Sequence, residues 1–345
     1  MDGSLATSEV VVPSVDVVPE SQPVGWRHKH LLDVDGLTAA DLDLVMRTAD
    51  AMREVLARPI TKVPALRGRN VTILFYEAST RTRVSFEVAA KNLSADVVNI
   101  AASTSSVTKG ESLVDTVRTV EALGAQMLVM RHGVSGAPYL AAEVFGGSVL
   151  NGGDGWHAHP TQALLDLYTM RSRLGSGDDD LGLAGKKIVI LGDVLHSRVA
   201  RSNIWTLTTA GADLWLCGPP TLMRGFEAWA GRGAAAGRRF TVTSDISAAV
   251  RDADVVMALR IQRERMESGL LPSLREYAAR YGLTAARLAT ARPGALVMHP
   301  GPMNEGVEIA ADVAAGAQSV ITDQVTNGVA IRMALLYLLA GVPRT

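Results

Sequence analysis

The segment at positions 79–82, Ser-Thr-Arg-Thr, places hydroxyl groups and an arginine directly after an apolar run. The run at 71–76 predicts a buried strand, and the apolar spacing that follows predicts an amphipathic helix over 82–93. Such a turn gathers free backbone N–H groups, hydroxyls and Arg81 at a helix N-terminus, where the helix dipole also favours an anion. Because the GxxxxGK[ST] signature of nucleotide-binding loops is missing from the sequence, we predict a site for a small phosphate compound.

Two further polar positions follow apolar segments in the first half. Arg131 ends the run at 127–130, and the sequence leaves open both an anion or carbonyl contact and a surface position for it. His157 and His159 stand in a glycine-rich segment, but no nearby cluster of Cys, Asp or Glu completes a tetrahedral metal set. Because a helix start disfavours the charged imidazole, we expect a neutral His159 that donates a hydrogen bond to a carbonyl oxygen.

The second half carries groups suited to carboxylates and amines. Arg260 and Gln262 follow the run at 255–258, and side chains two apart in an extended segment face the same way. They could hold one carboxylate, with a solvated charge run as the equal alternative in isolation. The prolines in His299-Pro300-Gly301-Pro302 leave carbonyl oxygens free to accept from an amine, or simply form a rigid turn. The polar segment 103–111 is typical of a solvated loop when considered alone.

Alternating strand and helix patterns must position these residues. We predict strands at 71–76, 97–100, 127–130, 188–191, 213–217, 240–243, 255–258 and 295–298. We predict helices at 39–56 after Thr38, at 82–93, at 113–123, after Tyr139, and at 162–174, 199–210 and 329–339. The alternation predicts an α/β fold of two doubly wound parallel-sheet domains. Ligands bind at the carboxyl ends of such strands, so the active site is expected in the cleft between the domains.

Composition and segment boundaries limit the class of protein. The 345 residues carry a formal net charge of -1, which provides no global attraction to nucleic acid or membrane. No apolar run reaches the roughly 20 residues that span a bilayer, and the single Cys217 suits a reducing, cytoplasmic compartment. Residues 1–25 are expected to form a disordered or loose tail without the features of a targeting signal. We expect domains at 26–174 and 175–325, and a C-terminal helix at 326–345 that packs back on the first domain.

These segments, in this order, resemble the aspartate/ornithine transcarbamoylase family from about residue 29 to the C-terminus. The resemblance rests on Ser79-Thr80-Arg81-Thr82-Arg83, Lys109-Gly110-Glu111, His159-Pro160-Thr161-Gln162 and His299-Pro300-Gly301-Pro302. It implies carbamoyl transfer from carbamoyl phosphate to an amino acid, without metal or cofactor. The cations of the second half resemble those of the aspartate-specific members, which act in pyrimidine synthesis. The ornithine-specific members carry a Cys in place of Pro300.

The resemblance also implies a role for each matching residue. Those implied to bind carbamoyl phosphate are Ser79, Thr80, Arg81, Thr82, Ser105, Arg131, His159, Gln162, Pro300 and Gly301. Those implied to bind L-aspartate are Lys109, Arg198, Arg260 and Gln262, and those implied in catalysis are Arg81, Thr82, Lys109, Arg131 and His159. Glu77 is implied to pair with Arg198 and Arg265 on domain closure.

The family relationship further implies a homotrimer in which Ser105 and Lys109 reach the site of a neighbouring subunit. Some members also assemble with regulatory chains or dihydroorotase. Glu305 departs from the Arg that many relatives carry, which could alter closure. Two alternatives stay open: a transcarbamoylase for another amine, and a catalytically silent homologue that serves as a scaffold. A nicotinamide enzyme is disfavoured because GxGxxG is missing from the sequence.

Overall fold

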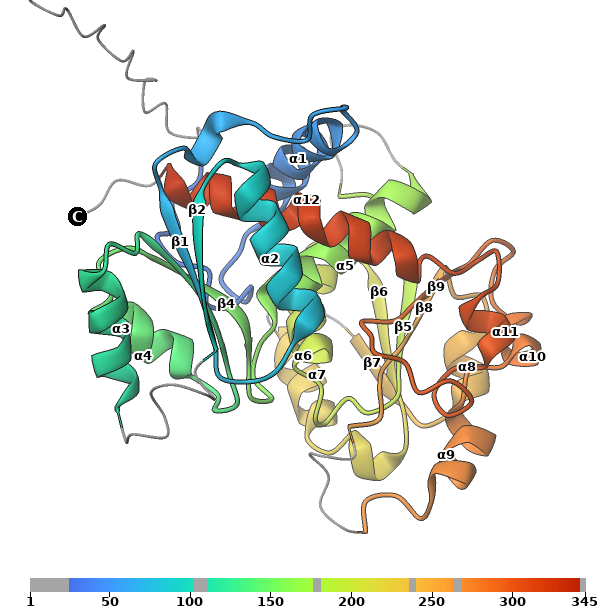
Figure 1. The fold of residues 1–345 in the computed structure, drawn as a ribbon. Helices are drawn as coiled ribbons and strands as arrows, with labels where there is room; N and C mark the ends of the chain where they lie inside the picture. The colour runs from blue at the N-terminus through green and yellow to red at the C-terminus, as the bar shows by residue number, and fades with distance from the viewer. Residues whose placement is uncertain (1–24, 102–110, 176–180, 236–239, 263–268, 342–345) are drawn as a thin grey trace, which may run out of the picture.

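The computed structural model describes residues 25–101, 111–175, 181–235, 240–262 and 269–341, which form two parallel sheets with helices around them (Figure 1). The first sheet has the strand order β2-β1-β3-β4. Its strands are β1 (Asn70–Phe75), β2 (Asp96–Ala101), β3 (Met127–His132) and β4 (Ser148–Asp154), all paired in parallel. The strand order reverses direction between β1 and β3, where a doubly wound sheet opens a crevice for ligands.

The second sheet has the order β7-β6-β5-β8-β9 and is also parallel. Its strands are β5 (Lys187–Leu191), β6 (Asp213–Cys217), β7 (Phe240–Thr243), β8 (Val255–Ala258) and β9 (Leu296–Met298). Here the order reverses between β5 and β8. The predicted fold class, with two doubly wound sheets, is confirmed.

Helices cover the outer face of each sheet. On the first sheet these are α3 (Leu113–Ala122) and α4 (Ala137–Val144), at the left of Figure 1. On the second they are α8 (Ile246–Val250), α9 (Leu274–Tyr281), α10 (Ala285–Leu288) and α11 (Ala311–Ala314), at its right. Valine, leucine and alanine side chains between sheet and helix exclude water, which provides most of the driving force for these layers.

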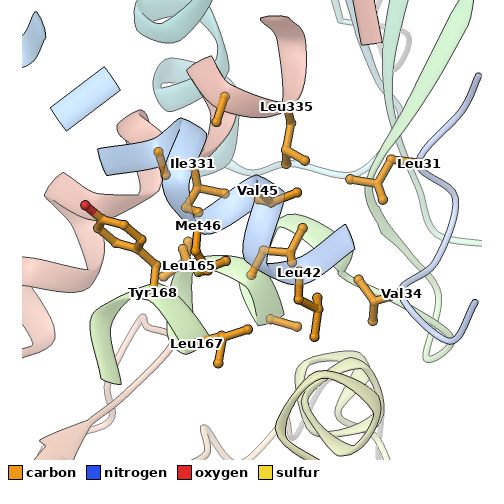
Figure 2. Close-up of a cluster of buried hydrophobic side chains, with 14 of the residues drawn as sticks. Leu31, Val34, Leu42, Val45, Met46, Leu165, Leu167, Tyr168, Ile331 and Leu335 are labelled. Carbon is orange, nitrogen blue, oxygen red and sulfur yellow. The ribbon is translucent and has the colours of Figure 1, made fainter. Parts of the chain in front are cut away.

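The remaining helices pack between and above the sheets. They are α1 (Ala39–Leu56), α2 (Thr80–Asn92), α5 (Pro160–Leu174), α6 (Arg198–Thr209), α7 (Phe226–Ala235) and α12 (Ile321–Ala340). The C-terminal helix α12 packs on α1, α2 and α5 of the first half, and α5 packs on α6 of the second. Figure 2 shows the core formed where α1, α5 and α12 meet, with Leu42, Met46, Leu165 and Ile331 turned toward one another. A continuous apolar core therefore joins the two halves.

Local signals located most elements but not all. Thr38 caps α1 as predicted, in a reciprocal pair with Asp41. The strand β4 was missed because its Asn-Gly-Gly-Asp segment is typical of a loop, whereas pairing with β3 and burial along its whole length keep it extended. Helix α12 begins at Ile321, earlier than the predicted residue 329. The prediction began too late because the first two turns of the helix are polar and show no apolar periodicity. Helices α7 to α11 and the short 3-10 helices η1 (Pro64–Leu66) and η4 (Pro220–Leu222) were not predicted either.

Candidate active site

A cavity of about 860 Å3 lies at the carboxyl ends of both sheets. Its walls come from the segments after β1, β3 and β4 of the first sheet and after β5, β8 and β9 of the second, together with α5 and α12. The predicted site residues that line it are Glu77, Ser79, Thr80, Arg81, Thr82, Arg131, His159, Gln162, Arg198, Arg260, Gln262, Pro300 and Gly301. Ser105, Lys109 and Arg265 lie outside the described residues.

One end of the cavity is the N-terminus of α2. The helix begins at Thr80 with Ser79 as N-cap, and Ser79 makes no capping hydrogen bond through its side chain. The first N–H groups of the helix and these hydroxyls therefore stay available to an anion. The Arg81 guanidinium packs directly over Gly301, where a Cβ atom would come within 2.7 Å of Arg81 Nη1. Partial burial and the charge of Arg260 lower the pKa of Arg81, as expected where cations gather around an anion site.

Glu77 joins the two sheets through a pair of arginines. Its Oε1 accepts hydrogen bonds from Arg131 Nη2 and Arg198 Nη2, each at 2.6 Å, and its Oε2 accepts from Arg198 Nη1 at 3.1 Å. Arg131 also donates to the carbonyl oxygen of Gly152, and Arg198 to that of Gly155. The expected Glu77–Arg198 pair is present, whereas the contact with Arg131 was not predicted. Both guanidinium groups are thereby fixed at the cavity wall.

His159 is the N-cap of α5 and is 5% exposed. Its backbone N–H donates to Ser202 Oγ at 2.9 Å, which ties the start of α5 to α6. Burial, followed by the charge of Arg131, holds the pKa of His159 well below its usual value, so the imidazole is neutral near pH 7. Within the described residues its Nδ1 has no hydrogen-bond partner. The ring is thus a neutral polar group placed beside two arginines.

Two buried charged residues, one behind the cavity and one in its wall, were not predicted as site residues. Asp166, one turn after Gln162 in α5, accepts a hydrogen bond from Gln162 Nε2 at 2.9 Å. Arg332 of α12 is 4% exposed, lines the cavity, and donates to Ser85 Oγ and to the carbonyl oxygen of Gly328. Burial lowers the pKa of Arg332 to about 10. The sequence signal that could have identified Arg332 is its charge within the otherwise strongly apolar segment 329–339.

The second half of the chain also contributes cations to the cavity. Arg198, at the N-terminus of α6, lines it together with Arg260 and Gln262, which follow β8. The Trp156 side chain, 42% exposed, also lines the cavity and meets the buried His196 ring edge to face, with centroids 4.9 Å apart. An arrangement of cations and an amide suits a small dicarboxylate.

Several other polar residues lie apart from this chemistry. Glu305 is exposed and outside the cavity lining. His157 pairs with Asp154 at 3.1 Å, outside the cavity lining. Throughout the described part of the chain, no group of three or more His, Cys, Asp or Glu side chains could hold a metal ion. No helix among the described residues is long and apolar enough to cross a membrane.

Fold and cavity together have the architecture of a two-domain transferase, and comparison with known families agrees. The family model for the carbamoyl-phosphate-binding domain of aspartate/ornithine carbamoyltransferases matches residues 29–172, and that for their Asp/Orn-binding domain matches residues 184–339. The chain belongs to the aspartate/ornithine carbamoyltransferase family.

Similar proteins within this family are aspartate carbamoyltransferases. The catalytic subunit from Roseiflexus sp. (strain RS-1) is 58% identical over 315 residues, which cover 91% of this chain and 96% of that protein. Aspartate transcarbamoylase from Trypanosoma cruzi, in a crystal structure with carbamoyl phosphate and aspartate, is 31% identical with a TM-score of 0.81, covering 92% and 98% of the two chains. A complex of that enzyme with N-(phosphonacetyl)-L-aspartic acid gives a TM-score of 0.79 at 30% identity, covering 93% of this chain and 98% of the other.

Proposed function

We propose that this chain transfers the carbamoyl group of carbamoyl phosphate to the amino group of L-aspartate, giving N-carbamoyl-L-aspartate and phosphate, a step of pyrimidine synthesis. The observation that carries the proposal is one cavity that combines a helix N-terminus and Arg81 with Arg198, Arg260 and Gln262. The first set suits a phosphate and the second a dicarboxylate. His159 and Arg131 line the same cavity.

These groups supply a reaction path without a protein nucleophile. The phosphate sits on the N-terminus of α2 and Arg81, so the carbamoyl carbonyl is directed at His159, Arg131 and Thr82. The aspartate amine attacks the carbamoyl carbon, the new N–C bond forms, and the developing oxyanion accepts hydrogen bonds from these donors. The C–O bond to phosphate then breaks, and the leaving phosphate takes the amine proton. Positioning and preorganised charge provide most of the rate enhancement.

The finer assignments belong to the same proposal. Residues 26–174 would bind carbamoyl phosphate and residues 175–325 aspartate, while the helix predicted at 326–345, described as far as residue 341, supports the first domain. The tail predicted at 1–25 lies, except for its last residue, outside the described residues. We propose a homotrimer with shared active sites, to which Ser105 and Lys109 contribute from a neighbouring subunit. Exposed Val84 and Val88 on α2 and Val98 on the edge strand β2 support a protein contact at this face. The buried thiol of Cys217 supports a cytoplasmic location.

Steady-state assays with aspartate and with ornithine as acceptor test the activity. Carbamoylation of aspartate is expected, and activity with ornithine alone would refute the proposal.

Mixing Arg81→Ala chains with Lys109→Ala chains tests the shared site, because mixed trimers regain an intact site and part of the activity. Verified mixed trimers without any recovery would rule out sharing. Native mass measurement also reveals any association with dihydroorotase or regulatory chains.

A further inference from the structure

A buried carboxylate behind the cavity organises three amide side chains. Asp166 in α5 has 0% exposure. Its Oδ1 accepts hydrogen bonds from Gln162 Nε2 at 2.9 Å and from Gln324 Nε2 at 2.7 Å, and its Oδ2 accepts from Asn203 Nδ2 at 2.9 Å. The partners come from α5, α12 and α6, so this carboxylate links the first half of the chain to the second.

The carboxylate dictates which way each amide points. Burial raises the pKa of Asp166 to about 6, and above that pH the carboxylate is ionised and only accepts hydrogen bonds. Each amide must then turn its NH2 group toward Asp166 and its carbonyl oxygen away. For Gln162, which lines the cavity, this directs the carbonyl oxygen away from Asp166 and leaves it available there. For Gln324, it directs the carbonyl oxygen to the backbone N–H of His299, at 3.0 Å.

The second link reaches the turn after β9. His299 Nδ1 accepts a hydrogen bond from the backbone N–H of Gly301 at 2.8 Å. Gln324 therefore holds the start of the turn, and His299 holds its far side, which together set the direction of the carbonyl groups at Pro300 and Gly301. One buried carboxylate thus acts on two separate sets of acceptors in the same cavity.

We propose that Asp166 is a positioning residue that selects for the NH2 group of the donor substrate, because it fixes both the Gln162 carbonyl and the 300–301 carbonyls as acceptors. This inference rests on the proposed function, because carbamoyl phosphate carries an NH2 group that can donate to these oxygens, which the family resemblance places in its binding site. A residue with a purely structural role at this place could be another amide, which both donates and accepts hydrogen bonds and lets its neighbours pair in several orientations. An ionised carboxylate only accepts, and therefore permits one orientation of each neighbouring amide.

Asp166→Asn tests the inference through amide recognition. Asn offers one NH2 group and one oxygen to three donors: with its oxygen at the Oδ1 place it opposes Asn203, and with its NH2 group there it opposes Gln162 and Gln324. Asn203 Nδ2 also donates to the carbonyl oxygen of Val199, at 3.1 Å, and resists reversal, so we expect the NH2 group at the Oδ1 place. Of the two glutamines, Gln324 is held by His299, so Gln162 is the amide expected to turn. Its NH2 group then faces the NH2 group of the ligand, donor against donor.

The measurement is calorimetric binding of phosphonoacetamide and of 2-oxopropylphosphonate, which differ only by NH2 in place of CH3. In the unmodified protein we expect preference for the amide. In Asp166→Asn we expect the affinity for the amide to fall about 10-fold to 100-fold, since a mispaired buried polar group is costly, while the ketone changes less than about 3-fold. Equal losses for both ligands, or an unchanged preference, would overturn the inference.

Two controls separate this result from general damage. Asp50→Asn removes a carboxylate that also bonds to α5, through Arg171 at 2.8 Å, and should leave both affinities unchanged. When Gln162 is already replaced by alanine, Asp166→Asn should reduce the affinity for the amide ligand less, because only the carbonyl oxygens at Pro300 and Gly301 can still respond. If Asp166→Asn does not fold, Gln324→Ala must show a selective loss of the amide ligand instead, or the inference fails. Because binding needs no turnover, a protein that shows this selectivity but does not carbamoylate aspartate would refute only the proposed function.

Discussion

Replacing Glu77 by alanine should uncouple the two halves of the cavity. Glu77 follows β1 of the first sheet, and Arg198 begins α6 beyond β5 of the second, so their pair spans the cleft. The side chain of Glu77 is 25% exposed, against 10% for Arg131 and 6% for Arg198. The alanine variant therefore removes the carboxylate that the two largely buried guanidinium groups share in the unmodified protein.

The size of the effect follows from this geometry. Removing one partner of a buried ion pair costs about 3–5 kcal/mol, and partial exposure of Glu77 places the loss near the lower end, about 3 kcal/mol. Since each 1.4 kcal/mol is a factor of ten, we expect a loss of about 100-fold in kcat/KM for aspartate. Arg131 keeps its bond to the carbonyl oxygen of Gly152, so carbamoyl phosphate binding should change less.

Initial-rate kinetics with each substrate varied in turn provide the assay. Glu77→Gln is the matched variant, because it keeps the shape and one acceptor oxygen but loses the charge, and it should lie between the unmodified protein and the alanine variant. The reasoning is refuted if Glu77→Ala keeps its kcat/KM for aspartate within about 3-fold, since the misplaced arginines could then not contribute to aspartate binding.

Three further outcomes are expected. Since burial lowers the pKa of His159, its neutral form should persist above pH 6.5, and His159→Ala should lower kcat about 10²-fold to 10³-fold at every such pH; a pH–rate profile with a step near 6.5 that the variant abolishes would contradict this. Burial raises the pKa of Asp33 to about 6, so the stability it contributes is present at low pH and lost as pH rises through about 6. Between pH 4.5 and pH 8, Asp33→Asn should therefore gain about 2 kcal/mol in free energy of unfolding relative to the unmodified protein, and an unchanged difference between the two proteins in thermal denaturation would exclude the effect. Gly301→Ala should raise KM for carbamoyl phosphate about 10-fold, because its φ of +65° and the 2.7 Å approach to Arg81 leave no room for a Cβ atom, whereas Gly294→Ala, with a φ of +81° and open space, should not.

The candidate site shows how far local sequence patterns reach. Strand and helix periodicity placed most polar segments at strand ends, and parallel sheets bring such ends to a common edge. This is why Arg81, Arg131, His159 and Arg260, which local patterns single out, line one cavity. Glu77 and Arg198 were expected there only from the family resemblance. It missed Asp166, because an acid after Gln162 on a helix has no distinguishing local pattern. It missed Arg332 for a related reason, since the helix pattern around it predicts burial without saying which cavity lies beside it.

The sequence by itself determined the fold class and the chemistry available at each strand end, because both depend on residues close together along the chain. Only the tertiary structure decided which of these groups meet. Glu77 is 54 positions from Arg131 and 121 from Arg198, and Asp166 is 158 positions from Gln324. Such pairs form only when the two sheets and α12 pack against one another, so their distances are properties of the assembled core.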